Sequence, residues 1–220
     1  MTSDKKSLLP QLQSALQDTE KVLLERLKSS KTDNEYFRWM LFIVGYYRGV
    51  KKVDSATALL KSFLETSFDD EQKAHCHLAL GQIAIDEQKL ETALSHFRTA
   101  LGFYPKKKKV TYVLLNNSGY CLNKLGRYSE GERYCRMAIE FNWKRASGYR
   151  NLGVSLEGQG NLVGAAWMLI EALKVDATDP SARALLQKLL AEHPSIVVHC
   201  PWIAQGLNSE FEAFATPPIV

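Results

Sequence analysis

Residues 74–105, AHCHLALGQIAIDEQKLETALSHFRTALGFYP, contain the spacing that decides the fold. Gly81 is followed by Ala93 twelve residues later and by Ala100 after seven more. Two antiparallel helices of about a dozen residues approach closely only where their side chains are small. The three small residues therefore predict a helical hairpin in which Gly81 faces Ala93 and Ala100.

The same spacing occurs twice more downstream. The corresponding residues are Gly119, Gly131 and Ala138 in one segment and Gly153, Ala165 and Ala172 in the next. Gly81 and Gly119 are 38 residues apart, whereas Gly119 and Gly153 are 34 apart. A period of this length is typical of a solenoid in which helical pairs stack on one another. Gly126 and Gly160 lie where the first helix of a pair should end, since a residue that adopts left-handed backbone is favoured there.

The three segments resemble the tetratricopeptide repeat, a helical hairpin of about 34 residues. Residues 74–105 have Leu80, Gly81, Ala93, Phe97, Ala100 and Pro105 in the family's places. Residues 146–179 match at Tyr149, Leu152, Gly153, Leu156, Ala165, Leu169 and Ala172, but Ala177 replaces the closing proline. Residues 112–145 keep Leu115, Gly119, Leu122, Tyr128 and Ala138 and depart at Gly131, Cys135 and Trp143. The resemblance implies an all-α, right-handed superhelical solenoid of antiparallel helix pairs that binds proteins and is not an enzyme.

The repeats account for most of the chain. Three clear repeats cover residues 72–107, 110–145 and 146–179, and a degenerate repeat covers residues 33–70. In the degenerate repeat Gly45 and Ala56 are the small pair, but they are 11 residues apart. This spacing predicts that the turn between its two helices is one residue short.

Helices should cover both ends of the solenoid. Residues 1–32 should contain a capping helix, because apolar residues recur there at helical spacing. Residues 180–194 should form a C-terminal capping helix, with Asp179 as its cap and Pro180 in its first turn. The tail, residues 195–220, contains no Lys or Arg but carries two glutamates, and it places Ile203, Leu207, Phe211 and Phe214 on one stripe of a possible helix. We expect it to pack on the solenoid, either as an extra cap or as a ligand of the chain's own groove.

The composition of the chain indicates a soluble, cytoplasmic protein. Its 220 residues carry a net charge of +4. No segment approaches about 18 consecutive apolar residues, and the beginning has no apolar run typical of a signal peptide. In that setting the four cysteines are expected to be buried apolar side chains rather than disulfides.

Motifs that would indicate catalysis do not occur in the sequence. It contains no Gly-rich phosphate loop, no GxSxG and no HExxH, and its five histidines are scattered. His75, Cys76 and His77 are consecutive, but neighbouring residues on a helix diverge by about 100°, so these three cannot hold one metal ion without ligands from elsewhere. We expect no enzymatic activity, no cofactor and no metal.

In the family, the first helix of each hairpin lines a concave wall. The resemblance therefore implies a peptide-binding groove at Gln82, Asn116, Asn117, Tyr120, Lys124, Arg150 and Asn151. Asn117 and Asn151 hold the same place in successive repeats, which is similar to the ladder with which some members hold an extended peptide backbone. A carboxamide both donates and accepts, which suits a main chain. The alternative is that these are ordinary exposed helix residues, since Ala79 interrupts the row.

The clamp with which some members bind the carboxylate of Hsp70 or Hsp90 tails is not present. Of its five places only Asn117 matches, although Arg150 lies one place from the required arginine and could still pair with a carboxylate. Binding of those tails is not predicted. Two functions are expected: a non-catalytic adaptor for an extended peptide or partner helix, or a client-dedicated chaperone similar in architecture to type III secretion chaperones.

Basic residues are concentrated in the middle of the chain. Residues 106–150 hold 11 Lys or Arg and 3 Glu. Lys106 to Lys109 explain the longer 38-residue spacing and should form an exposed loop. This excess favours an acidic peptide partner, with a simply solvated loop as the alternative. Nucleic acid is not expected, because no aromatic residues are interleaved with the four lysines.

Overall fold

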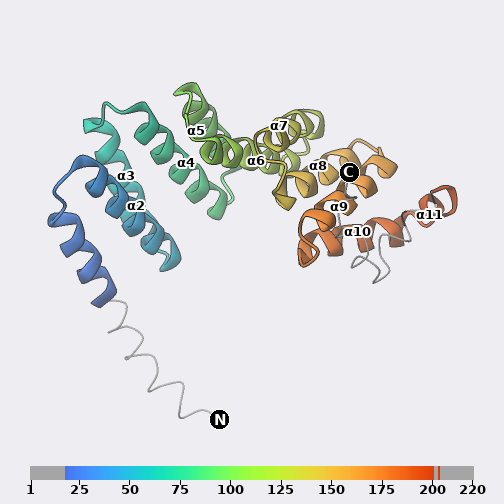
Figure 1. The fold of residues 1–220 in the computed structure, drawn as a ribbon, viewed down its shortest axis with the longest axis horizontal. Helices are drawn as coiled ribbons and strands as arrows, with labels where there is room; N and C mark the ends of the chain where they lie inside the picture. The colour runs from blue at the N-terminus through green and yellow to red at the C-terminus, as the bar shows by residue number, and fades with distance from the viewer. Residues whose placement is uncertain (1–17, 201–202, 204–220) are drawn as a thin grey trace, which may run out of the picture.

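The computed structural model describes residues 18–200 and Ile203. Residues 18–28 are helical, and four helical hairpins follow. The hairpins are α2 (Asp33–Gly49) with α3 (Val53–Thr66), α4 (Asp70–Asp86) with α5 (Leu90–Gly102), α6 (Lys108–Lys124) with α7 (Tyr128–Phe141), and α8 (Ala146–Gly158) with α9 (Leu162–Val175). Helices α10 (Pro180–Glu192) and α11 (Ser195–His199) come last. The pairs succeed one another along the long axis, which confirms the all-helical solenoid (Figure 1).

The turn inside each hairpin has the same length and backbone conformation. Three residues separate the two helices in all four hairpins. The middle residue is always left-handed, with φ of 63° at Lys51, 62° at Gln88, 74° at Gly126 and 79° at Gly160. The expectation for the two glycines is confirmed. The short turn expected in the degenerate repeat is wrong, because three residues also separate α2 and α3. Lys51 adopts the left-handed conformation there without being glycine.

The degenerate repeat uses Val44, not Gly45, as its turn-core residue. Gly45 is exposed, and a Cβ added to it would meet nothing within 4 Å. Val44 is 2% exposed, and the fully buried Ala56 follows it by twelve residues. The spacing is thus the same as in the other three hairpins, and the identification of Gly45 as the packing residue was wrong by one position.

Each turn-core glycine makes room for the side chain sixteen positions later, which is bulky in two repeats and is Cys135 opposite Gly119. A Cβ on Gly81 would collide with the ring of Phe97. On Gly153 it would lie 2.9 Å from Cγ of Leu169. The predicted facing of Gly81 to Ala93 and Ala100 is therefore corrected: both alanines are buried, but the longer side chain between them crosses the interface.

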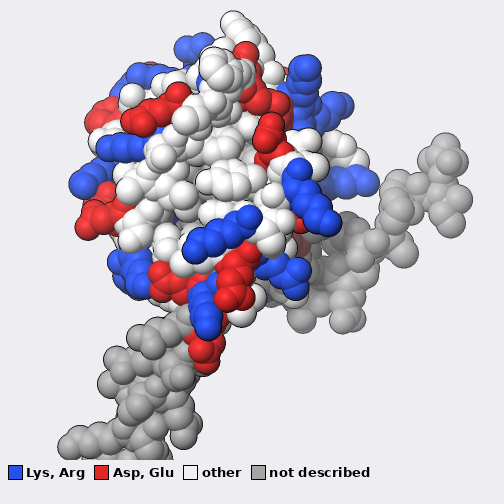
Figure 2. Space-filling model, turned by 90° about the vertical axis from the view of Figure 1, so that its left-hand side faces the viewer, with Lys and Arg blue, Asp and Glu red and all other residues white. Residues whose placement is uncertain are grey.

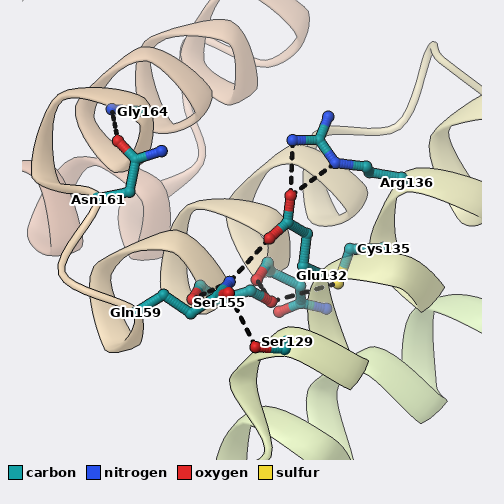
Figure 3. A network of polar contacts seen from close by, with 9 residues as sticks. Ser129, Glu132, Cys135, Arg136, Ser155, Gln159, Asn161 and Gly164 are labelled. Carbon is teal, nitrogen blue, oxygen red and sulfur yellow. Dashed lines mark hydrogen bonds and ion pairs between the residues drawn. The ribbon is translucent and has the colours of Figure 1, made fainter.

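Buried polar contacts join the second and third clear repeats. The Asn123 side chain, 7% exposed, donates from Nδ2 to the Asn151 carbonyl oxygen at 2.8 Å and accepts at Oδ1 from Ser155 Oγ at 2.7 Å. At the edge of the same interface Gln159 Nε2 donates to Glu132 Oε2 at 2.8 Å (Figure 3). Buried polar groups are costly unless paired, so these contacts favour one register between the hairpins.

The C-terminal end is capped as predicted. Asp179 Oδ1 accepts from the backbone N–H of Ser181 at 2.9 Å and of Ala182 at 3.0 Å, and Pro180 is the first residue of α10. Beyond α10, Ile196 and Ile203 are buried in a core that also contains residues of α8, α9 and α10. The beginning of the tail therefore packs as a cap. The rest of its predicted apolar stripe, and the N-terminal helix before residue 18, lie outside the described residues.

The lysine run is only partly a loop. Lys106 precedes α6, Lys107 is its N-cap residue, and Lys108 and Lys109 form its first turn. All four are exposed. The charges of Lys107, Lys108 and Lys109 thus lie at the positive end of the α6 dipole, and this placement is electrostatically unfavourable.

A histidine pair lies between the two helices of the first clear repeat. The Nδ1 atoms of His77 and His96 are 3.1 Å apart, and the His77 ring stacks on Phe103 at 5.9 Å. Burial lowers the pKa of both rings, and for His77 the second ring lowers it further. Burial also lowers the pKa of His75. The folded chain therefore favours the neutral form of all three.

The corrected register predicts opposite effects for one substitution at two glycines. Gly45→Ala should raise the free energy of unfolding by about 0.5–1 kcal/mol, because alanine is the better helix former and the site is open. Gly81→Ala should lower it by about 1–3 kcal/mol, because the new methyl group displaces Phe97. Urea unfolding of both variants measures the difference; a loss of stability in Gly45→Ala would contradict the register.

Stability should decrease on mild acidification. The unfolded chain takes up protons near the ordinary histidine pKa of about 6.5, whereas the folded chain does so only at lower pH. The stability that the neutral histidines contribute is therefore fully present above about pH 6.5, the histidine pKa of the unfolded chain, and it is lost as the pH falls through the lower pKa values of the folded chain. Urea unfolding at pH 7.5 and 5.5 should show this loss, and His96→Gln should reduce it. An unchanged pH dependence in that variant would show that the pair is not responsible.

Candidate functional site

The first helices of the four hairpins line one groove. Its pocket has a volume of about 310 Å3 and is lined by Arg48, Gln82, Ile85, Asp86, Asn116, Asn117, Tyr120, Arg150 and Asn151. Six of the seven predicted groove residues therefore come together. The seventh, Lys124, is adjacent: its Nζ lies 5.8 Å from the centroid of the Tyr120 ring.

One border of the groove is an ionic contact between α2 and α4. Arg48 donates to Asp86 Oδ2 from Nε at 3.1 Å and from Nη2 at 2.8 Å, and its Nη1 donates to Gln82 Oε1 at 3.0 Å. Arg48 was not predicted, because the groove residues were assigned only in the three clear repeats. With Val44 at the turn core, Arg48 takes the place that Ile85 holds in the next repeat.

The opposite border is an amide contact between α6 and α8. Asn151 Nδ2 donates to Asn116 Oδ1 at 3.1 Å, and only 8% of Asn151 is exposed. Asn117 differs, because its half-buried side chain makes no hydrogen bond to any residue that the structure describes. The expected ladder of two equivalent rungs is therefore uneven: Asn151 holds neighbouring repeats together, and Asn117 is available.

Arg150 also serves a contact between helices. Its guanidinium forms an ion pair with Asp179, the buried residue that caps α10. The side chain thus joins the last clear repeat to the capping helix. It borders both the groove and a second pocket, of about 380 Å3, whose lining includes Lys144, Arg145 and Asp176.

The centre of the groove combines Ile85, Asn117 and Tyr120. They supply an aliphatic surface, a free carboxamide and a phenol, with the Lys124 cation beside the phenol ring. Both borders are already paired, so a ligand meets polar groups that need a partner mainly in the centre. This arrangement fits an extended main chain with small apolar side chains.

The basic excess of residues 106–150 is spread over the molecule. Arg150 lines the groove and Lys124 stands next to it. On α7, however, Arg136 pairs with Glu132 at 2.7 Å, and Arg127, just before that helix, pairs with Glu130 at 2.7 Å. The groove is therefore only modestly positive.

The consecutive residues His75, Cys76 and His77 point to different surroundings. Cys76 is fully buried, and burial raises the pKa of its thiol to about 12. The His75 ring lies 5.9 Å from that of Phe37, whereas His77 contacts His96. Within residues 18–200 and Ile203, no three His, Cys, Asp or Glu side chains are grouped to hold a metal ion. None of the helices in this same part is long and apolar enough to cross a bilayer.

Comparison with known proteins supports the repeat assignment. No profile of a known protein family matches the chain. An uncharacterized TPR repeat-containing protein of Arabidopsis thaliana is 27% identical over 136 residues, which are 58% of this chain and 16% of that protein. The chain thus spans only a small part of this relative.

Solved structures share the fold. The Cut9–Hcn1 hetero-tetramer of the APC/C matches 70% of this chain and 30% of its own, with a TM-score of 0.62 and 20% identity. The first TPR domain of Spaghetti, bound to the HSP90 peptide SRMEEVD, matches 57% of this chain and 98% of its own, with a TM-score of 0.51 and 19% identity. Repeat spacing, relative and structures together assign this chain to the tetratricopeptide repeat proteins.

Proposed function

We propose that this chain is a non-catalytic adaptor that holds an extended peptide of a partner protein in the groove of its first helices. The observation that carries the proposal is the pair Asn117 and Tyr120. Both line the groove between two borders whose polar groups are already paired, and neither side chain forms a hydrogen bond to a described residue. Repeats of this family are in general protein-binding modules.

The recognition is directed at the peptide main chain. Asn117 offers a carboxamide that both donates and accepts, and Tyr120 adds a hydroxyl group. Ile85 provides apolar contact for a small side chain between them. With two arginines and one aspartate in its lining, the groove accepts an acidic residue but does not require one.

The groove should not bind the peptide that Spaghetti binds. A terminal carboxylate needs unpaired cations that line the groove, and here Arg48 is paired with Asp86 and Arg150 with Asp179. Lys124 lies against the Tyr120 ring and is not part of the lining. We expect no saturable binding of SRMEEVD by isothermal titration calorimetry. Binding that is lost in Arg150→Ala would contradict this assignment of Arg150.

Peptides selected for binding should depend on Asn117. From a displayed library of random twelve-residue peptides, those that bind the chain should lose about tenfold in affinity with Asn117→Ala, because two hydrogen bonds of about 0.5–1.5 kcal/mol each are removed. They should also lose affinity on methylation of single backbone nitrogens. Gln187→Ala, an exposed amide on α10, is the matched control and should bind normally. Equal losses of affinity in both variants would show that the peptides do not bind in the groove.

Replacing Asn151 and replacing Asn117 should have different effects on the stability of the chain. Asn151→Ala should lower the free energy of unfolding by about 1 kcal/mol, because it removes a contact between repeats. Asn117→Ala should change it by less than about 0.5 kcal/mol. Urea unfolding of the two variants makes the comparison, and a larger loss in Asn117→Ala would show that it, too, is a structural residue.

A further inference from the structure

A separate cleft, distinct from the groove and from the pocket beside Arg150, lies at the N-terminal end of the solenoid. It has a volume of about 790 Å3 and is formed where α3 ends and α2 and α4 begin. It shares no lining residue with the groove. Figure 2 looks onto this end of the molecule, where uncharged side chains form a continuous strip bordered by charges of both signs.

Aromatic rings form one side of the cleft. The rings of Tyr36 and Phe63 lie 6.4 Å apart between centroids and within 15° of parallel. Phe63 is held from behind by Phe37, at 5.1 Å. Phe68, in the loop between α3 and α4, is 95% exposed at the rim. Removing such an apolar side chain from water is favourable, so the exposed Phe68 ring favours a partner that covers it.

The charge of the cleft is negative. Its lining contains the carboxylates of Asp33 and Asp69 and no Lys or Arg. Helix α3 directs its C-terminal end here and has no basic residue in its last turn. The beginnings of α2 and α4 are positive, at roughly half a charge each, but two full charges and the α3 end outweigh them. The caps Thr32 and Asp69 already bond those N-termini.

We propose that this cleft binds a basic, partly apolar segment of a partner protein. A Lys or Arg side chain lies against the faces of Tyr36 and Phe63 and close to the Asp33 carboxylate. A neighbouring apolar side chain covers Phe68. Aromatic faces attract cations, and a carboxylate beside them adds an ion pair. The volume is large enough for several residues rather than one side chain.

The negative charge of the cleft favours a basic partner segment over the chain's own tail. Residues 195–220 contain no Lys or Arg, so they cannot supply the cation. Lys5 and Lys6 of the same chain could supply one, and the experiment below includes them. The cleft is separate from the groove, so the partner segment that it binds is not the groove peptide.

The probe is the peptide acetyl-Gly-Leu-Lys-Arg-Leu-Gly-amide, and its counterpart with two Glu in place of Lys-Arg is the control. We expect saturable shifts of the backbone amide resonances of Asn34, Ser62 and Gln72 with the basic peptide only, weakening as NaCl is raised. Asp33→Asn and Phe68→Ala should each weaken binding roughly fivefold to tenfold.

Matched variants make the result decisive. Glu65→Gln on α3 and Phe42→Ala on α2, both exposed and outside the cleft, should bind the probe normally. Equal binding of the acidic peptide, or equal losses in these controls, would overturn the proposal. Tighter binding in the double variant Lys5→Glu, Lys6→Glu would also overturn it, because the chain's own segment would then be the occupant. Asn117→Ala should leave this binding unchanged, which separates it from the groove.

Discussion

The close contact between a turn-core glycine and the side chain sixteen positions later determines the geometry of the three clear repeats. Gly81 receives Phe97, and Gly153 receives Leu169. Because the contact sets the rotation of the first helix about its own axis, it also decides which residues face the groove. Gln82 and Tyr120, each directly after a turn-core glycine, line the pocket. Gly45 holds the same place after Val44, which explains why a glycine in the middle of α2 is exposed.

Contacts between neighbouring repeats lie on the same wall as the proposed peptide site. Arg48 with Asp86 and Asn151 with Asn116 join consecutive hairpins along the groove, and Arg150 with Asp179 joins the last hairpin to the capping helix α10. A residue that keeps neighbouring repeats in register has fewer hydrogen-bonding groups left for a peptide. The side chains of Asn117 and Tyr120, which have no hydrogen-bonding partner among the described residues, therefore carry the proposed binding.

The sequence predicted the hairpins well because the residues that determine each hairpin lie within that hairpin. Small residues twelve apart and a left-handed turn residue depend on one hairpin alone, and Gly126 and Gly160 were placed correctly. Val44 was missed because a buried valine carries no turn signal, whereas the adjacent glycine does. The partners of Arg48 and Arg150 were not predictable, since they lie 38 and 29 residues away and depend on how successive hairpins are rotated.

Charge divides the surface into two regions with different preferences. The groove has two arginines and one aspartate in its lining, with Lys124 beside it, whereas the cleft at the N-terminal end has only carboxylates. Residues 106–150 do not make the groove strongly basic, because Arg127 and Arg136 are paired with glutamates at α7. Under the two proposals, a partner segment suited to one region is therefore poorly suited to the other. A single protein that contacted both would have to change from basic to neutral or acidic along its length.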